Sequence, residues 1–140
     1  MFTRSGSARW QGGLKDGNGT VSTQSGALDG LPYGFNTRFG DEPGTNPEEL
    51  IGAAHAACFS MALSNLLSGA GIGGISIETT SKITLEKDGD GFTVTKAHLV
   101  TSISADADKA QIEDLAQKAK AGCPISKLLN AEVTMDATVA

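Results

Sequence analysis

The chain has two cysteines, Cys58 and Cys123, and these thiols are the groups in the sequence best suited to redox chemistry. They lie 65 residues apart, which excludes a CxxC redox motif and a zinc site built from closely spaced pairs. A free cysteine is often only a small buried hydrophobe. The count alone therefore leaves open whether these thiols are reactive or inert.

The local surroundings of the two cysteines differ. Cys58 lies about three turns into an apolar helix expected over residues 47–69, where the helix dipole no longer acts. A reactive thiolate there needs a cation from elsewhere in the protein. Cys123 precedes Pro124 at the expected start of a short helix, where free backbone N–H groups lower a thiol pKa. Local physics therefore predicts that Cys123 is the more acidic thiol.

The elements that position these residues follow the order βββ-α-ββ-αα-β, which is an α+β arrangement. Alternating apolar residues between glycine-rich turns predict strands over residues 4–10, 19–24, 33–39, 75–86, 92–103 and 132–139. In the last of these, Val133, Met135, Ala137 and Val139 should face inward. Apolar residues at helical spacing and capping residues predict helices over residues 47–69, 108–121 and 124–129.

The helix expected over residues 47–69 is apolar nearly all round. Asn46 suits its N-cap and Pro47 its first position. Such a helix is normally buried on all sides, and a chain of 140 residues has little material to surround it. A second subunit is therefore expected to cover it. The polar residues within the stretch argue against a membrane-spanning helix.

Composition narrows the class of protein further. A length of 140 residues suits one domain, residues 1–140. The net charge of −5, with no cluster of Lys and Arg, argues against a nucleic-acid partner. No apolar segment near the N-terminus resembles a signal sequence, so we expect a cytoplasmic protein without a membrane partner. A purely structural disulfide is not expected in that compartment.

Three segments resemble a known family. The segments GTNPEELIGAAHAACF (44–59) and AKAGCPIS (119–126) are similar to the two signatures of the OsmC/Ohr family, named for osmotically inducible protein C and organic hydroperoxide resistance. The segment PYGFNTRF (32–39) is similar to the OsmC branch. The resemblance covers nearly the whole chain. It implies an OsmC-like fold, with antiparallel sheets around a long central helix in an intertwined homodimer.

The resemblance also implies an activity, that of a thiol-dependent peroxidase reducing organic hydroperoxides in oxidative and osmotic stress defence. Cys58 would be the peroxidatic nucleophile and Cys123 the resolving cysteine. Arg38 would lower the pKa of Cys58 and polarise the peroxide, while Glu48 would hold Arg38. The Cys58 sulfenate would condense with Cys123 to a disulfide, which a dithiol, lipoyl-type in this family, would reduce. No cofactor or metal is implied.

Some alternatives stay open. Glu48 precedes Cys58 by ten residues, about 15 Å of helix rise, so one arginine tip cannot easily reach both. Either the first turn is not regular helix, or the site combines two subunits. His55, at i−3 to Cys58, is expected to be a packed or interface histidine. Apolar side chains are expected to frame the site and favour organic peroxides: Phe35, Phe39, Phe59 and Met61.

Two rival functions fit the same thiols. One is a peroxidase that favours hydrogen peroxide. The other is a redox-sensing or binding protein that uses a reversible disulfide without turnover.

Overall fold

The computed structural model describes residues 1–140. The chain divides into two compact units, Met1–Leu50 and Ile51–Ala140. The long helix α2 (Pro47–Gly69) begins in the first unit and continues into the second. Its bounds are those predicted, and the Asn46 side chain caps it by accepting the backbone N–H of Glu49 at 2.8 Å.

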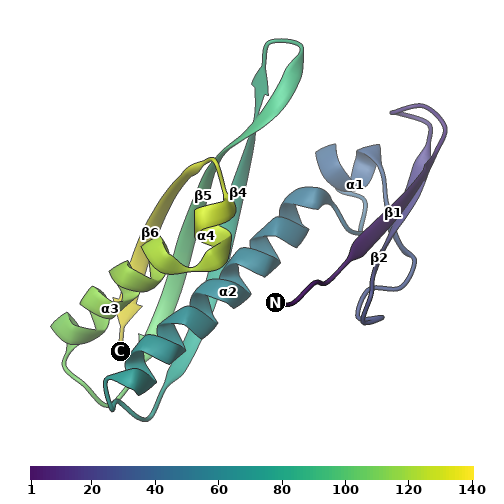
Figure 1. Ribbon diagram of the computed structural model, residues 1–140. Coiled ribbons are helices and arrows are strands. Elements are labelled where there is room, and N and C mark those ends of the chain that lie inside the picture. The colour runs from purple at the N-terminus through teal and green to yellow at the C-terminus, as the bar shows by residue number, and fades with distance from the viewer. The chain divides into compact units, whose positions relative to one another are not determined.

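The first unit is built on a three-stranded antiparallel sheet of order β1-β2-β3. Its strands are β1 (Gly6–Gln11), β2 (Asn18–Thr23) and β3 (Leu31–Tyr33). Figure 1 shows β1 and β2 side by side. The chain leaves β1 through Gly12, whose positive φ of 95° suits a residue without a side chain. The two predicted N-terminal strands are confirmed.

The strand predicted over residues 33–39 is wrong beyond Tyr33. The chain forms a short helix there, α1 (Phe35–Phe39). The Thr37 hydroxyl accepts the Gly34 N–H at 2.7 Å and lies 3.0 Å from the Gly34 carbonyl oxygen, which closes the turn. Aromatic and β-branched residues favour strands by propensity, but this local side-chain bonding to the backbone overrides the preference.

The second unit packs helices on a three-stranded sheet of order β4-β5-β6. Its strands are β4 (Ser76–Asp88), β5 (Gly91–Ser104) and β6 (Glu132–Val139), and its helices after α2 are α3 (Lys109–Gly122) and α4 (Pro124–Leu128). The predicted elements of this unit are confirmed to within one or two residues at each end.

The expectation of purely antiparallel sheets is wrong for the second unit. β4 and β5 pair antiparallel, but β6 pairs parallel to β5, with Ala97 opposite Val133 and Ile103 opposite Val139. The reason is the connection, since α3 and α4 carry the chain back before β6 starts, as a crossover between parallel strands requires.

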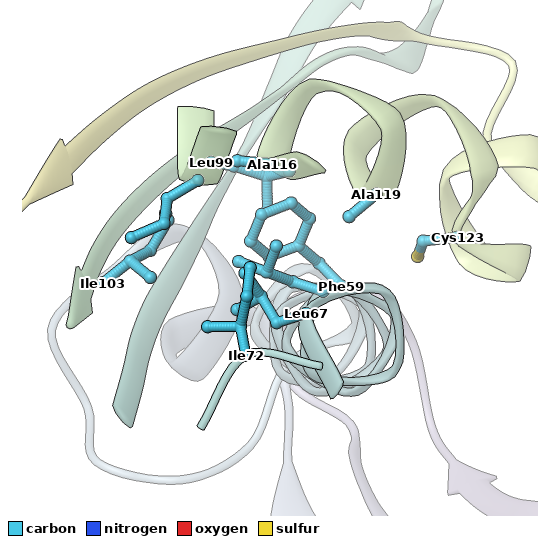
Figure 2. Packing of buried hydrophobic residues seen from close by; sticks show 10 residues of the cluster. Phe59, Leu67, Ile72, Leu99, Ile103, Ala116, Ala119 and Cys123 are labelled. Atoms are coloured by element: carbon cyan, nitrogen blue, oxygen red, sulfur yellow. The ribbon is translucent and has the colours of Figure 1, made fainter. Parts of the chain in front are cut away.

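The core lies between this sheet and the helices α2 and α3 (Figure 2). Its largest fully buried apolar side chains come from all three elements: Phe59, Leu63 and Leu67 of α2, Leu99 and Ile103 of β5, and Ile112 of α3. The predicted inward residues of β6 pack against this cluster, so the alternation is confirmed. One face of the sheet is thereby covered.

A single chain buries α2 on one side only, so its expected cover by a second subunit stays a prediction. Its buried residues form one stripe of Gly52, His55, Phe59, Leu63 and Leu67. The opposite side, with Ala53, Ala54, Ala57 and Met61, is exposed. By length and composition α2 could cross a membrane, while Phe59, Leu63 and Leu67 of its buried stripe pack in the core of the second unit.

Gly52 is the point where α2 tolerates no side chain. A Cβ there would lie 2.8 Å from the Ser81 carbonyl oxygen. Glycine to alanine normally stabilises a helix interior by about 1 kcal/mol, but here overpacking should dominate. We expect Gly52→Ala to lower the free energy of unfolding in urea by about 1–3 kcal/mol. Gly69→Ala, with no atom within 4 Å, is the control and should be neutral or stabilising. An equally neutral Gly52→Ala would refute the steric argument.

Candidate active site

The second unit brings the two cysteines together. Cys58 lies beside the buried stripe of α2, and Cys123 lies at the junction of α3 and α4. Both are free thiols, and the Cys58 thiol donates a hydrogen bond to the sulfur of Cys123. Figure 2 shows Cys123 at the edge of the core cluster, with its sulfur on the side facing α2. Residues 65 positions apart thus form one thiol pair.

The two thiols differ in access. Cys58 is half-buried and lines an open pocket of about 780 Å³ together with Ala54, Met61, Leu66 and Ile125. Cys123 is fully buried, with 0% of its surface exposed. A molecule that enters this pocket therefore meets the Cys58 sulfur, while Cys123 is shielded.

The two thiols also differ in acidity. Burial raises the pKa of Cys58, and the hydrogen bond that it donates to Cys123 and the charge of Cys123 raise it further, while the Ile125 N–H opposes this shift. Burial also opposes ionisation of Cys123. Hydrogen bonds from Cys58, from the N–H and hydroxyl of Ser126 and from the Ile125 N–H outweigh it, so the pKa of Cys123 is lowered. The predicted order of acidity is confirmed.

Lys118 is the one charged residue that lines the Cys58 pocket. Its ammonium group pairs with Asp114 at 3.3 Å, and both side chains are about two-thirds exposed, at 64% and 66%. It is not among the groups that shift the pKa of Cys58. No cation of the second unit therefore contributes to lowering the pKa of Cys58.

The first unit holds an arginine clamped by a carboxylate. Arg38 Nη2 lies 2.6 Å from Glu48 Oε1, and Arg38 Nε lies 3.1 Å from Glu48 Oε2. Such a two-point contact fixes the plane of the guanidinium. Glu49 instead pairs with the Asn46 side-chain amide. The expected contact of Arg38 with Glu48 is therefore present, and Glu49 takes no part in it.

Aromatic side chains surround this arginine. A cavity of about 180 Å³ is lined by Trp10, Tyr33, Phe35, Phe39 and Arg38, with Leu14, Gly34 and Pro47 completing the wall. The Arg38 guanidinium carbon lies 5.4 Å from the centre of the Phe39 ring, within cation–π range. Of the four apolar residues expected to frame a site, Phe35 and Phe39 lie in this cavity and Met61 in the Cys58 pocket. Phe59 is wrong as a lining residue because it is fully buried in the core.

The start of α2 bears on how these parts combine. The helix is regular from Pro47 onward, so an irregular first turn does not bring Glu48 closer to Cys58. The other alternative, a site built from two subunits, stays a prediction.

The ring nitrogens of both histidines form hydrogen bonds with neighbouring side chains. His55 is fully buried and bonds two serines, Ser81 and Ser126. His98 bonds Thr134 and Asp136 and so ties β5 to β6. The expected packing role of His55 is confirmed. The sequence did not predict either serine partner of His55. The one available signal was the i+3 spacing of Ser126 from Cys123, which brings residues together on a helix and so places Ser126 near a candidate site residue.

No group of three or more His, Cys, Asp or Glu side chains is placed to hold a metal ion. The chemistry that the site residues themselves offer is that of a thiol pair and a fixed cation.

Comparison with known proteins places the chain in a family. Residues 40–138 match the family model described as OsmC-like protein. The chain is 54% identical over 134 residues to the peroxiredoxin OsmC of Escherichia coli (strain K12), covering 95% of this chain and 94% of that protein. It is 33% identical over 117 residues to the organic hydroperoxide resistance protein OhrB of Bacillus subtilis (strain 168), covering 82% and 84% of the two chains.

Solved structures agree with this placement. The crystal structure of Bacillus subtilis OhrB matches with a TM-score of 0.71 at 27% identity, covering 99% of this chain and 98% of that one. An organic hydroperoxide resistance protein from Elizabethkingia anophelis matches with a TM-score of 0.75 at 26% identity, covering 100% and 96%. The predicted α+β, OsmC-like fold is confirmed, and the chain belongs to the OsmC-like protein family.

Proposed function

We propose that this protein is a cysteine-based peroxidase that reduces organic hydroperoxides to alcohols in oxidative and osmotic stress defence. The observation that carries the proposal is the pairing of an accessible thiol, Cys58, with a buried and more acidic one, Cys123. Two relatives carry matching names, one a peroxiredoxin and the other an organic hydroperoxide resistance protein.

Access assigns the first step to Cys58. Its thiolate attacks the distal oxygen of the hydroperoxide, a sulfur–oxygen bond forms and the oxygen–oxygen bond breaks. The alkoxide takes a proton and leaves as the alcohol, and Cys58 becomes a sulfenic acid. Cys123 is too deeply buried for this role.

Acidity assigns the second step to Cys123. Its thiolate attacks the Cys58 sulfur, the disulfide bond forms and the sulfur–oxygen bond breaks. The departing hydroxide takes a proton and leaves as water. An external dithiol of the lipoyl type then reduces the disulfide by thiol–disulfide exchange. The lowered pKa of Cys123 makes its thiolate available for the attack.

Arg38 supplies the cation that Cys58 lacks. Its guanidinium, held by Glu48, stabilises the Cys58 thiolate and polarises the peroxide. We place this pair in a homodimer, where Arg38 and Glu48 of one subunit serve Cys58 of the other. The exposed apolar side of α2, with Ala54, Ala57 and Met61, supports a subunit interface. The chain, residues 1–140, then acts as a single OsmC-like domain in the cytoplasm.

The surroundings favour a peroxide with an organic tail. Aromatic residues line the Arg38 cavity and apolar ones the Cys58 pocket. We expect kcat/KM for cumene hydroperoxide to exceed that for hydrogen peroxide by at least about tenfold, since each apolar group buried by the site adds binding energy. Initial rates with dihydrolipoamide as the reductant measure this ratio. Equal values of kcat/KM for the two peroxides would favour the alternative of a peroxidase that acts on hydrogen peroxide.

The same pair of free thiols would also suit a redox sensor that reacts once. Counting alcohol released per protein in the presence of dihydrolipoamide separates the two functions. A peroxidase produces many equivalents, whereas a sensor stops after one.

A further inference from the structure

His55 is the most enclosed polar side chain of the second unit. It is 0% exposed on the buried stripe of α2. Its Nδ1 lies 2.7 Å from Ser81 Oγ of β4, and its Nε2 lies 2.8 Å from Ser126 Oγ of α4. Burial lowers the pKa of His55, which favours the neutral ring. A neutral imidazole has one donor and one acceptor nitrogen.

The hydroxyl of Ser126 connects this histidine to Cys123. Besides meeting His55, it donates a hydrogen bond to the sulfur of Cys123. A hydroxyl has only one proton. When Ser126 donates to Cys123, it must therefore accept from His55, which places the ring proton on Nε2. Nδ1 is then the acceptor, and Ser81 donates to it.

The direction of this chain of hydrogen bonds decides whether Cys123 receives a hydrogen bond from Ser126. With the ring proton on Nε2, the hydrogen bonds run from Ser81 to His55, then to Ser126 and to Cys123. With the proton on Nδ1, Ser126 would have to donate to Nε2 instead, and Cys123 would lose that donor. A hydrogen bond to a charged sulfur stabilises the thiolate.

We propose, on the basis of the peroxidase function above, that His55 is a positioning residue for disulfide formation, whose Nε2–H directs the Ser126 hydroxyl proton toward Cys123. His55 touches neither the peroxide nor the reacting sulfurs. It keeps Cys123 in the form that attacks the Cys58 sulfenic acid, where the disulfide bond forms, the sulfur–oxygen bond breaks and water leaves. The first step, at Cys58, does not depend on it.

The test uses the thiolate absorbance at 240 nm in a Cys58→Ser background, which leaves one titrating sulfur and requires no peroxide. We expect His55→Leu and Ser126→Ala each to raise the pKa of Cys123 by about one unit, because each removes support from a hydrogen bond to a charged group. The double variant should shift no further, since both changes break one chain of bonds. His55→Gln, whose amide can donate to Ser126, should recover most of the shift.

The matched control is Ser60→Ala. Ser60 lies on α2, as His55 does, and its hydroxyl bonds Thr79 at 2.9 Å. Thr79 lies on β4, as Ser81 does, but this bond has no link to Cys123. Ser60→Ala should leave the titration unchanged. An equal shift in Ser60→Ala, or no shift in His55→Leu and Ser126→Ala, would overturn the proposal. Because this titration is independent of turnover, a failed peroxidase assay leaves its outcome readable.

A second measurement needs no substitution of His55. The chain has 2 histidines, so nitrogen-15 spectra of the Cys58→Ser protein resolve the His55 ring. At a pH where the 240 nm band shows Cys123 ionised, we expect the proton on Nε2. A proton on Nδ1 in that state would contradict the proposal, even if His55→Leu fails to fold.

Discussion

Cys58→Ser is expected to reduce multiple-turnover reduction of cumene hydroperoxide by at least about 10³-fold, because the variant has no nucleophile that the peroxide can reach. Cys123 remains in this variant, but it is fully buried. Alcohol production with dihydrolipoamide in excess measures the loss. The circular dichroism spectrum should match that of the wild type, since serine is close to cysteine in volume.

Cys123→Ser provides the matched comparison. It should still release about one equivalent of alcohol per site, because the attacking thiol is intact, and then stall with Cys58 as a sulfenic acid that dimedone traps. If the roles were reversed, Cys123→Ser would lose the first equivalent and Cys58→Ser would keep it. The acidity of Cys123 makes this a real alternative, and access is the property that argues against it.

Arg38→Met is expected to lower kcat/KM for cumene hydroperoxide by about 100-fold, because it removes the fixed cation that stabilises the thiolate and the departing oxygen. Glu48→Gln keeps the arginine but weakens its clamp, so we expect a smaller loss of about tenfold. The pH dependence of Cys58 alkylation, measured in Cys123→Ser protein, should shift upward in Arg38→Met. The matched control is Arg9→Met, which removes an exposed arginine from β1 of the same unit.

Mixing two inactive variants tests whether the site is shared. Cys58→Ser keeps Arg38, and Arg38→Met keeps Cys58. If the site combines residues of two subunits, each mixed dimer holds one intact site, and random exchange should restore about a quarter of the wild-type activity. If Arg38 serves Cys58 of its own chain, the mixture should stay as inactive as its components.

The sequence predicted best where a local signal sets the structure. Asn46 and Pro47 mark the start of α2 because their chemistry suits a helix N-terminus regardless of what packs nearby. The position of Cys123 before α4 accounts for part of its lowered pKa, through the backbone N–H groups of Ser126 and Ile125, but the largest lowering comes from the hydrogen bond with Cys58, which no local pattern predicts.

The sequence predicted the structure poorly where it depends on strand direction or on contacts between residues far apart in the chain. The alternation in β6 shows which residues face the core, but it is the same for either strand direction, so the parallel pairing with β5 was missed. The segment Phe35–Phe39 has strand-like residues, and only the bonding of Thr37 with Gly34 turns it into a helix. The serine partners of His55 come from β4 and α4, and no local pattern predicts that meeting.

The pairing of Cys58 with Cys123 joins two points 65 residues apart along the chain. If the proposed disulfide forms, it closes a loop of about that length and lowers the conformational entropy of the denatured ensemble, which would stabilise the folded state by about 4 kcal/mol. Folding and oxidation are then linked. The folded chain holds the sulfurs together and so favours the disulfide, and the disulfide favours the folded chain by the same free energy. Each reduction of the proposed disulfide would return the protein to its less stable form.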